Sequence, residues 1–309
     1  MDAPSATSNF LRTCLAGRER DFPTPGVTLS VDGRDWRRAA DCLTDESFVA
    51  AFLDHQRRFT PDLDRKGQGA YTIGEYSHML AGAMVPLLVG FRVVPDFRPE
   101  ACAIGYDVQP VEHAGRLLDT RNWRITVPAD GYHVEAGSEG SPAADPGATG
   151  ADLTALCDRF RTLVEDHCAP LVETVHRQTA LGRQALWRLV GDSFSQVFLD
   201  AGRAYGCLDR ATAAALLVLK DARSPLTNRQ MHFFDIAVHD DRDPSREIMS
   251  MTFRARGGCC RYYTVEGGHL CTTCVLQDPA VRDLKIETHL RSRLGLAPPQ
   301  PIAKAGAGV

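Results

Sequence analysis

The chain has 309 residues, enough for one large domain or two moderate ones, and its apolar and charged fractions are ordinary for a globular protein. The formal net charge is −4 and no basic block occurs, so the sequence argues against a nucleic-acid binder, which would carry a basic stripe. No run of eighteen or more apolar residues is present, which argues against an integral membrane segment.

The N-terminus and the cysteines indicate the compartment. The first residues lack a basic stretch followed by an apolar one, so we expect a cytoplasmic protein rather than a secreted one. Six of the ten cysteines are scattered, and in a reducing compartment we interpret them as small buried hydrophobic residues. These six are Cys14, Cys42, Cys102, Cys157, Cys168 and Cys207.

Residues 1–150 predict an N-terminal α+β part, although residues 1–35 show no strong period. A helix is expected after Thr44, and Pro61 should end it. The next helix has the T-x-x-E pattern of a capping box at Thr72 and Glu75, so we expect it to begin there and to end at a Gly90 cap. Apolar runs bounded by prolines then predict short strands at residues 91–94, 101–108 and 123–127.

Residues 129–151 are rich in Gly, Ala, Ser and Pro, and we interpret them as a solvated linker or mobile loop. This composition places the internal boundary of the chain at residue 150. After it, apolar residues repeat at intervals of three and four, so residues 151–296 are expected to be mainly helical. The helices should begin at Leu153, at Pro170, at about Arg183 and near residue 211.

The end of the chain predicts two strands, a cysteine-containing segment and a last helix. The strands are expected at residues 233–238 and 248–253, and the second leads into the segment of about residues 254–296. Asp278-Pro279 is a favourable start for a helix that should stop at Gly295 and pack close to the cysteines. The tail, residues 297–309, is expected to be disordered. These elements together predict an α+β fold.

Four cysteines fall close together in the segment after the second strand: Cys259, Cys260, Cys271 and Cys274. Four thiols at this spacing indicate a metal site, either one zinc ion or an iron–sulfur cluster. The adjacent pair makes a poor zinc knuckle, because neighbouring side chains of an extended segment point to opposite faces. A [2Fe–2S] cluster needs two thiolates on each of two irons, so its ligands reach around a wider object, and the spacing favours it. The flanking pairs at residues 257–258 and 267–268 are glycines, which permit the positive φ of a wrapping loop.

The pattern C-C-x₁₀-C-x₂-C near a C-terminus, with arginine before it and tyrosine after it, resembles the FhuF-like ferric-siderophore reductase family. The resemblance implies that the four cysteines bind a [2Fe–2S] cluster. It also implies a siderophore-iron reductase, in which the cluster passes one electron to Fe³⁺ held by a siderophore, often a hydroxamate. One departure is that Val275 and Leu276 follow the last cysteine, where many relatives carry proline.

Several residues near the cysteines are candidates for contact with the substrate or for tuning of the cluster. A reduced cluster with four thiolates is strongly anionic, so Arg254, Arg256 and Arg261 would stabilise it. Backbone N–H groups of the neighbouring glycines are candidate donors to sulfur, and Tyr262 is a candidate for shielding the cluster or stacking on a siderophore. The chain has no dinucleotide-binding or P-loop pattern, so we expect a ferredoxin or another external protein to deliver electrons.

Two other functions stay open from the residues alone. The cysteines would suit a zinc-stabilised binding module, and a cluster on the same ligands would suit a redox or iron sensor. A sensor usually needs a DNA-binding or partner element, and no helix-turn-helix pattern is visible in the sequence. Colour separates zinc from the cluster, since thiolate-ligated iron absorbs at roughly 400–600 nm and zinc does not.

Overall fold

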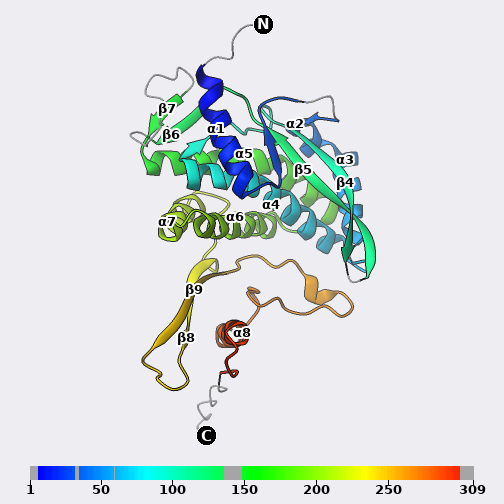
Figure 1. Cartoon of the computed structure of the whole chain (residues 1–309). Helices are drawn as coiled ribbons and strands as arrows, with labels where there is room; N and C mark the ends of the chain where they lie inside the picture. The colour runs from blue at the N-terminus through cyan, green and yellow to red at the C-terminus, as the bar shows by residue number, and fades with distance from the viewer. Residues whose placement is uncertain (1–5, 32–34, 59, 114, 136–147, 300–309) are drawn as a thin grey trace.

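The structure, a computed structural model, describes residues 6–31, 35–58, 60–113, 115–135 and 148–299. Within these residues helices predominate and the strands form three small sheets, so the predicted α+β fold is confirmed (Figure 1). The helices are α1 Ala6–Asp21, α2 Ala39–Thr44, α3 Glu46–His55, α4 Arg65–Phe91, α5 Leu153–Thr179, α6 Arg183–Ala204, α7 Leu208–Leu219 and α8 Pro279–Arg293, with short 3₁₀ turns η1 Gln56–Arg58 and η2 Tyr262–Thr264.

The strands are short except in two antiparallel hairpins, β4–β5 and β8–β9. The sheet orders are β1-β5-β4-β2, β3-β6-β7 and the antiparallel pair β8-β9. The strands are β1 Gly26–Thr28, β2 Arg37–Arg38, β3 Val93–Val94, β4 Ala103–His113, β5 Arg116–Thr126, β6 Tyr132–Glu135, β7 Ala148–Ala151, β8 His232–His239 and β9 Glu247–Ala255.

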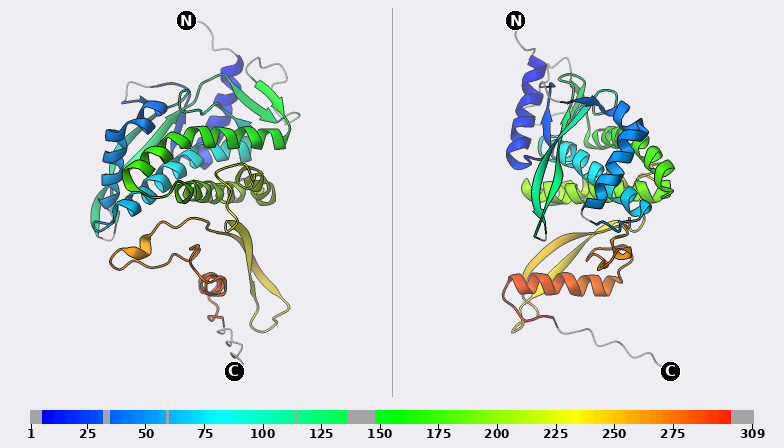
Figure 2. Two further views of the ribbon diagram at one scale, coloured as in Figure 1. Left: turned by 180° about the vertical axis from the view of Figure 1, so that it is seen from behind. Right: turned by 90° about the vertical axis from the view of Figure 1, so that its right-hand side faces the viewer.

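Helix α4 lies at the centre of the molecule and is buried around most of its circumference. Helices α5 and α6 pack against it, and the β8–β9 hairpin and α8 project from the α6 side (Figure 1, Figure 2). One core of buried residues runs from Leu11 in α1 to Met231 before β8, so it includes side chains from both sides of residue 150. The predicted division of the chain at residues 150 and 151 stays a prediction.

The start of α4 differs from the sequence-based expectation. The helix begins at Arg65, where the Asp64 carboxylate caps it by accepting a hydrogen bond from the Gly67 N–H at 2.6 Å. Thr72 and Glu75 therefore lie inside the helix. The capping-box interpretation is wrong, because an aspartate upstream already satisfies the first free N–H groups.

Two further helix boundaries were predicted wrongly. The cap of α4 is Arg92 with φ 55°, and Gly90 lies in the last turn, where a Cβ would stand 2.7 Å from the ring of Tyr205. This glycine is thus required for close packing and not for the cap. Helix α5 runs through Pro170 without ending, since apolar residues on both sides of the proline are buried in the core. Helix α1 has no counterpart among the predicted elements.

The C-terminal helix α8 begins and ends as predicted. Asp278 caps it through the N–H groups of its first turn, Pro279 is its first residue, and Gly295 has a φ of 71° just after its end. The helix packs on the β8–β9 hairpin, where Ile286 and Leu290 form a small core with Val238. The expected position of α8 close to the cysteines stays a prediction.

Residues 136–147 of the predicted linker and residues 300–309 of the predicted tail lie outside the described residues. Within the described ranges, none of the helices is both long enough and apolar enough to cross a membrane.

A fully buried histidine joins three elements of the core. The ring of His167 in α5 donates from Nδ1 to the Phe97 carbonyl at 2.5 Å, and its Nε2 accepts from the Tyr76 hydroxyl at 2.7 Å. Burial lowers the pKa of His167 from 6.5 to about 4, against weaker opposing effects from Phe97 and Glu100. The folded protein therefore holds this ring neutral at pH values where an unfolded chain protonates it.

We predict that the free energy of unfolding falls as the pH drops from about 6.5 to about 4, because only the unfolded state takes up the His167 proton in that window. Denaturant melts at several pH values measure it. His167→Gln should flatten this part of the profile, while His289→Gln on the exposed face of α8 should leave it unchanged. Equal slopes for both variants and the parent protein would contradict the assignment.

Candidate functional site

The four cysteines follow strand β9 and lie below the helices in the view of Figure 1, on the side of α6. Residues 256–276, called here the cysteine loop, follow β9 and run past α6 toward the N-terminus of α4 (Figure 1, Figure 2). Cys274 is buried and the other three cysteines of the loop are half-buried. The Cys274 N–H donates to the Cys271 carbonyl at 3.0 Å, which closes a tight turn between the last two cysteines.

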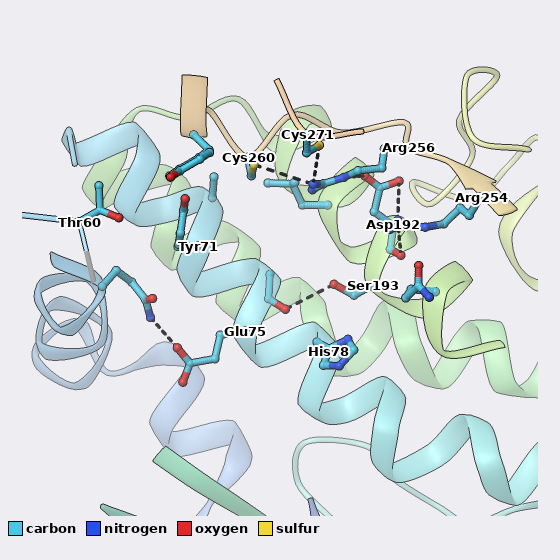
Figure 3. A pocket seen from close by; sticks show the side chains of 16 residues that line it. Thr60, Tyr71, Glu75, His78, Asp192, Ser193, Arg254, Arg256, Cys260 and Cys271 are labelled. Atoms are coloured by element: carbon cyan, nitrogen blue, oxygen red, sulfur yellow. Dashed lines mark hydrogen bonds and ion pairs between the residues drawn. The ribbon is translucent and has the colours of Figure 1, made fainter. Parts of the chain in front are cut away.

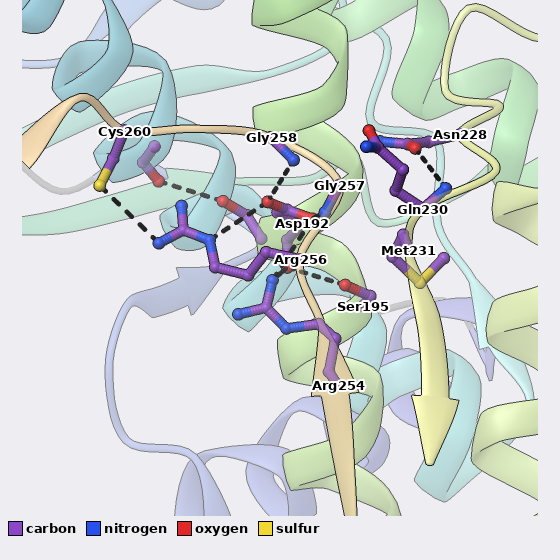
Figure 4. Close-up of polar contacts among 12 residues, drawn as sticks. Asp192, Ser195, Asn228, Gln230, Met231, Arg254, Arg256, Gly257, Gly258 and Cys260 are labelled. Carbon is purple, nitrogen blue, oxygen red and sulfur yellow. Dashed lines mark hydrogen bonds and ion pairs between the residues drawn. The ribbon is translucent and has the colours of Figure 1, made fainter. Parts of the chain in front are cut away.

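A buried carboxylate on α6 holds the beginning of the cysteine loop (Figure 4). The side chain of Asp192 is 4% exposed, and its two oxygens accept hydrogen bonds from the N–H groups of Gly257 at 2.8 Å and Gly258 at 2.9 Å. The same carboxylate lies 3.3 Å from Nε of Arg256 and 3.6 Å from Nη1 of Arg254. Four donor groups therefore surround one buried carboxylate, and their interactions offset the free-energy cost of removing its charge from water.

Asp192 was not among the predicted site residues. It lies between Leu189 and Ser195 at intervals of three, and both of these neighbours are also buried. An acid on the buried face of an amphipathic helix needs partners, and this position was the signal that could have identified it.

The Arg256 guanidinium connects Asp192 to two of the cysteines. Its Nη1 lies 3.6 Å from Sγ of Cys271 and 3.8 Å from Sγ of Cys260. Burial acts to lower the pKa of Arg256, but Asp192 and the two cysteines raise it overall, so the group stays charged. Burial raises the pKa of the Cys271 thiol, and Arg256 opposes this by favouring the thiolate.

The glycines of the loop serve close packing more than positive φ. Only Gly267 of the four has a positive φ, 70°. A Cβ on Gly258 would stand 3.1 Å from the backbone of Arg188 in α6, and one on Gly257 would stand 1.8 Å from Nδ2 of Asn228. Gly257 and Gly258 thus let the loop approach its neighbours closely. We expected their N–H groups to donate to sulfur, but they donate to Asp192.

The other side of the loop is tied to the segment before α4. The Arg261 guanidinium donates to Asp64, the cap of α4, at 2.8 Å, and the Glu266 N–H donates to Asp62 at 2.6 Å. Arg261 adopts a left-handed φ of 65°, and its N–H lies 3.4 Å from Sγ of Cys259. The loop is therefore fixed at two places, on α6 and at the beginning of α4.

A cavity of about 730 Å³ lies between α4, α6 and the cysteine loop (Figure 3). This volume is within the range of small-molecule sites. Its wall is mostly apolar and includes the side chains of Cys260 and Cys271. The lining residues are Gln56, Thr60, Ala70, Tyr71, Gly74, Glu75, His78, Leu189, Asp192, Ser193, Gln196, Arg254, Arg256, Cys260, Tyr262 and Cys271.

Three of the four proposed substrate contacts lie in the wall of this cavity: Arg254, Arg256 and Tyr262. The fourth, Arg261, is not among the lining residues and pairs with Asp64 instead. Arg254 and Arg256 are held at α6 by Asp192, whereas the guanidinium of Arg261 is held at the beginning of α4 by Asp64.

Sequence reasoning missed the α4 side of the cavity. Tyr71, Glu75 and His78 lie three and four residues apart, so they form one polar stripe on a helix that is otherwise buried. This spacing is visible in the sequence, but of the three residues only Glu75 is interpreted there, as part of a capping box. Glu75 accepts hydrogen bonds from Gln56 at 2.8 Å and from the indole of Trp123 at 2.9 Å.

Two titratable groups of the stripe stay neutral near pH 7. Burial, together with nearby Cys260 and Tyr262, raises the pKa of Tyr71 to about 12. The surrounding protein lowers the pKa of His78 below 6.5 by desolvation, and Asp200 only partly opposes this. Tyr71 is therefore a hydrogen-bond donor on the cavity wall, and His78 adds no charge to it.

The four thiols are a suitable donor set for an iron–sulfur cluster, because thiolates are the ligands that such clusters prefer. Within the described ranges, no three His, Cys, Asp or Glu side chains are close enough together to hold a metal ion in the present arrangement.

Residues 256–276 match the family model described as the FhuF 2Fe-2S C-terminal domain. The resemblance to the FhuF-like family is confirmed. The matched segment begins at Arg256 and contains all four cysteines of the loop, and it supports an iron–sulfur cofactor. No curated protein matches the chain.

We predict that Gly268→Ala lowers both stability and iron content, because its Cβ would stand 1.9 Å from the Tyr262 carbonyl oxygen inside the loop. Such crowding costs about 1–3 kcal/mol in a packed site. The matched control is Gly182→Ala before α6, where no atom lies within 4 Å of the added carbon. Thermal unfolding and iron per chain measure the effect, and equal iron in the two variants would contradict it.

Proposed function

We propose that the protein is a siderophore-iron reductase, which passes one electron to Fe³⁺ held by a siderophore in the cavity and so releases Fe²⁺ in the cytoplasm. The observation that carries this proposal is the presence of Cys260 and Cys271 in the wall of a cavity large enough for a small ligand. A chelate bound there would lie against two of the four proposed cluster ligands.

The proposed reaction depends on the position of the chelate relative to the cluster more than on acid–base groups. When bound by the four cysteines, a [2Fe–2S] cluster would supply the electron. The chain's own residues bind the chelate and exclude water, and the apolar walls of the cavity with the Tyr71 hydroxyl are suited to this. Hard oxygen ligands hold Fe³⁺ far more tightly than Fe²⁺, so reduction alone loosens the iron and no proton transfer is needed.

The charges of the cavity wall favour the binding of an uncharged chelate, and a ferric hydroxamate is uncharged. Two carboxylates, Asp192 and Glu75, balance two guanidinium groups, Arg254 and Arg256, while His78 is neutral near pH 7. Three singly charged hydroxamates neutralise Fe³⁺, whereas three doubly charged catecholates leave three negative charges. Apart from the cysteines, these side chains of the wall carry no net charge, and a cluster on the cysteines would add negative charge, so a mostly apolar cavity disfavours burying such an anion.

The electron would enter from a separate protein of the ferredoxin type. The sequence has no dinucleotide-binding pattern that would let NAD(P)H reduce this chain directly. Cys259 and Cys274 are not part of the cavity wall, so a substrate in the cavity would not contact these two proposed ligands.

We predict that the protein, once reduced anaerobically, is rapidly reoxidised by a ferric hydroxamate siderophore while Fe²⁺ appears in a ferrous trap. Cys271→Ser should lose most of this activity together with the visible spectrum, because a proposed cluster ligand is removed. Cys207→Ser, which places a hydroxyl at the N-cap of α7, is the control and should behave as the parent protein.

Iron and acid-labile sulfide should be present in equal amounts. Stoichiometric zinc without sulfide would reject the cluster and favour a binding module. Reoxidation no faster than that of an unrelated [2Fe–2S] ferredoxin of similar potential would reject the reductase and favour a sensor.

We further predict that Gly74→Leu weakens siderophore binding. Gly74 lines the cavity and no atom lies within 4 Å of the place where its Cβ would be, so leucine would occupy ligand space. KM should rise on the order of tenfold or more. Gly74→Ala is the matched control: both variants should gain about 1 kcal/mol of helix stability, but alanine should change KM little. An unchanged KM in the leucine variant would place the substrate elsewhere.

A further inference from the structure

The pairing of Asp192 with Arg256 holds a guanidinium group next to the sulfur atoms of two cysteines. Arg256 is 19% exposed at its side chain, and within the described residues Asp192 is the carboxylate that pairs with it. Its backbone is also held, because its N–H donates to the Thr273 carbonyl at 3.2 Å. The guanidinium thus has a defined position rather than the freedom of a surface arginine.

That position coincides with the side of the loop that faces the cavity. The two cysteines that Nη1 contacts, Cys260 and Cys271, are the same two that line the cavity. Arg254, the other guanidinium on Asp192, donates to the Asp192 main-chain carbonyl at 2.7 Å and has no comparable contact with sulfur among the described residues. The two arginines that pair with Asp192 therefore differ: Arg256 places its charge next to the sulfur atoms, and Arg254 places its charge next to a main-chain carbonyl.

We propose that Asp192 is a positioning residue, which holds the Arg256 guanidinium against the sulfur atoms of Cys260 and Cys271 and thereby favours the reduced state of the proposed cluster. The proposal rests on the function given above for the presence of the cluster and for its reduction. The reduction adds one electron from an external reductant and one negative charge, with no bond made or broken. A cation fixed at the ligand sulfurs stabilises this added charge most where solvent is excluded.

A purely structural role for Asp192 makes the opposite prediction. If the carboxylate only held the loop backbone through Gly257 and Gly258, Asp192→Asn would remove a negative charge and leave Arg256 in place. The reduction potential would then rise. If Asp192 positions Arg256, the guanidinium leaves the sulfur atoms for solvent, and the potential falls because the cation lay closer to sulfur than the carboxylate did.

Redox titration of the cluster-loaded full chain tests the proposal, with Asp192→Asn, Arg256→Gln and the double variant. Both single variants should have a lower potential than the parent protein, and the double variant should be no lower than Arg256→Gln, because Asp192 acts through Arg256. A higher potential in Asp192→Asn, or additive decreases in the double variant, would overturn the proposal.

Asp64→Asn is the matched control. It breaks the other carboxylate–arginine pair of the loop, with Arg261, whose guanidinium does not contact sulfur among the described residues. Its potential should change less than that of Asp192→Asn, and an equal decrease would show that any loosening of the loop produces the shift.

A second measurement covers a variant that fails to retain the cluster. In the full chain before cluster loading, the Nε–H of Arg256 should exchange slowly with solvent in the parent protein and in Asp64→Asn, and rapidly in Asp192→Asn. Slow exchange in all three would overturn the proposal. Shifted potentials without reoxidation by ferric siderophores would reject the proposed reductase and leave the role of Asp192 standing.

Discussion

A carboxylate buried inside a helical layer must receive hydrogen bonds, and in this protein that requirement sets the course of the cysteine loop. Asp192 receives two main-chain N–H groups and two guanidinium groups from residues 254–258, so the burial of α6 and the placement of the loop depend on each other. The close approach also explains why Gly257 and Gly258 precede the first cysteine: a Cβ at Gly257 would overlap the side chain of Asn228, and one at Gly258 would crowd the backbone of α6.

The cavity exists because the loop is held at both of its sides. Asp192 fixes it on α6, and Asp62 with Asp64 fixes it at the beginning of α4. Between these two places α4 interrupts its buried surface with Tyr71, Glu75 and His78, and polar side chains that would be costly in a closed core here face the cavity. The helix thus supports the core on most of its circumference and lines the cavity on the rest.

The same contacts also determine the electrostatics of the site. In the cavity wall the two guanidinium groups of Arg254 and Arg256 are balanced by the two carboxylates of Asp192 and Glu75. At short range, however, Arg256 directs its charge at the sulfur atoms of Cys260 and Cys271. These four side chains are therefore balanced in charge as a group, while the charge close to the two sulfur atoms is positive, because the contributions fall off with distance.

The features that depend on neighbouring residues can be predicted from the sequence. The spacing of the four cysteines, the amphipathic period of α5 and α6, and the Asp278-Pro279 start of α8 were each readable within a few positions. Three other features depend on how the helices pack: Asp192 accepts from Gly257, Arg261 pairs with Asp64 outside the cavity, and the stripe on α4 lines the same cavity as Cys260 and Cys271. These partners are 65 and 197 residues apart in the two hydrogen-bonded pairs, and contacts at such separations arise from the packing of whole helices, which no local pattern of side chains encodes.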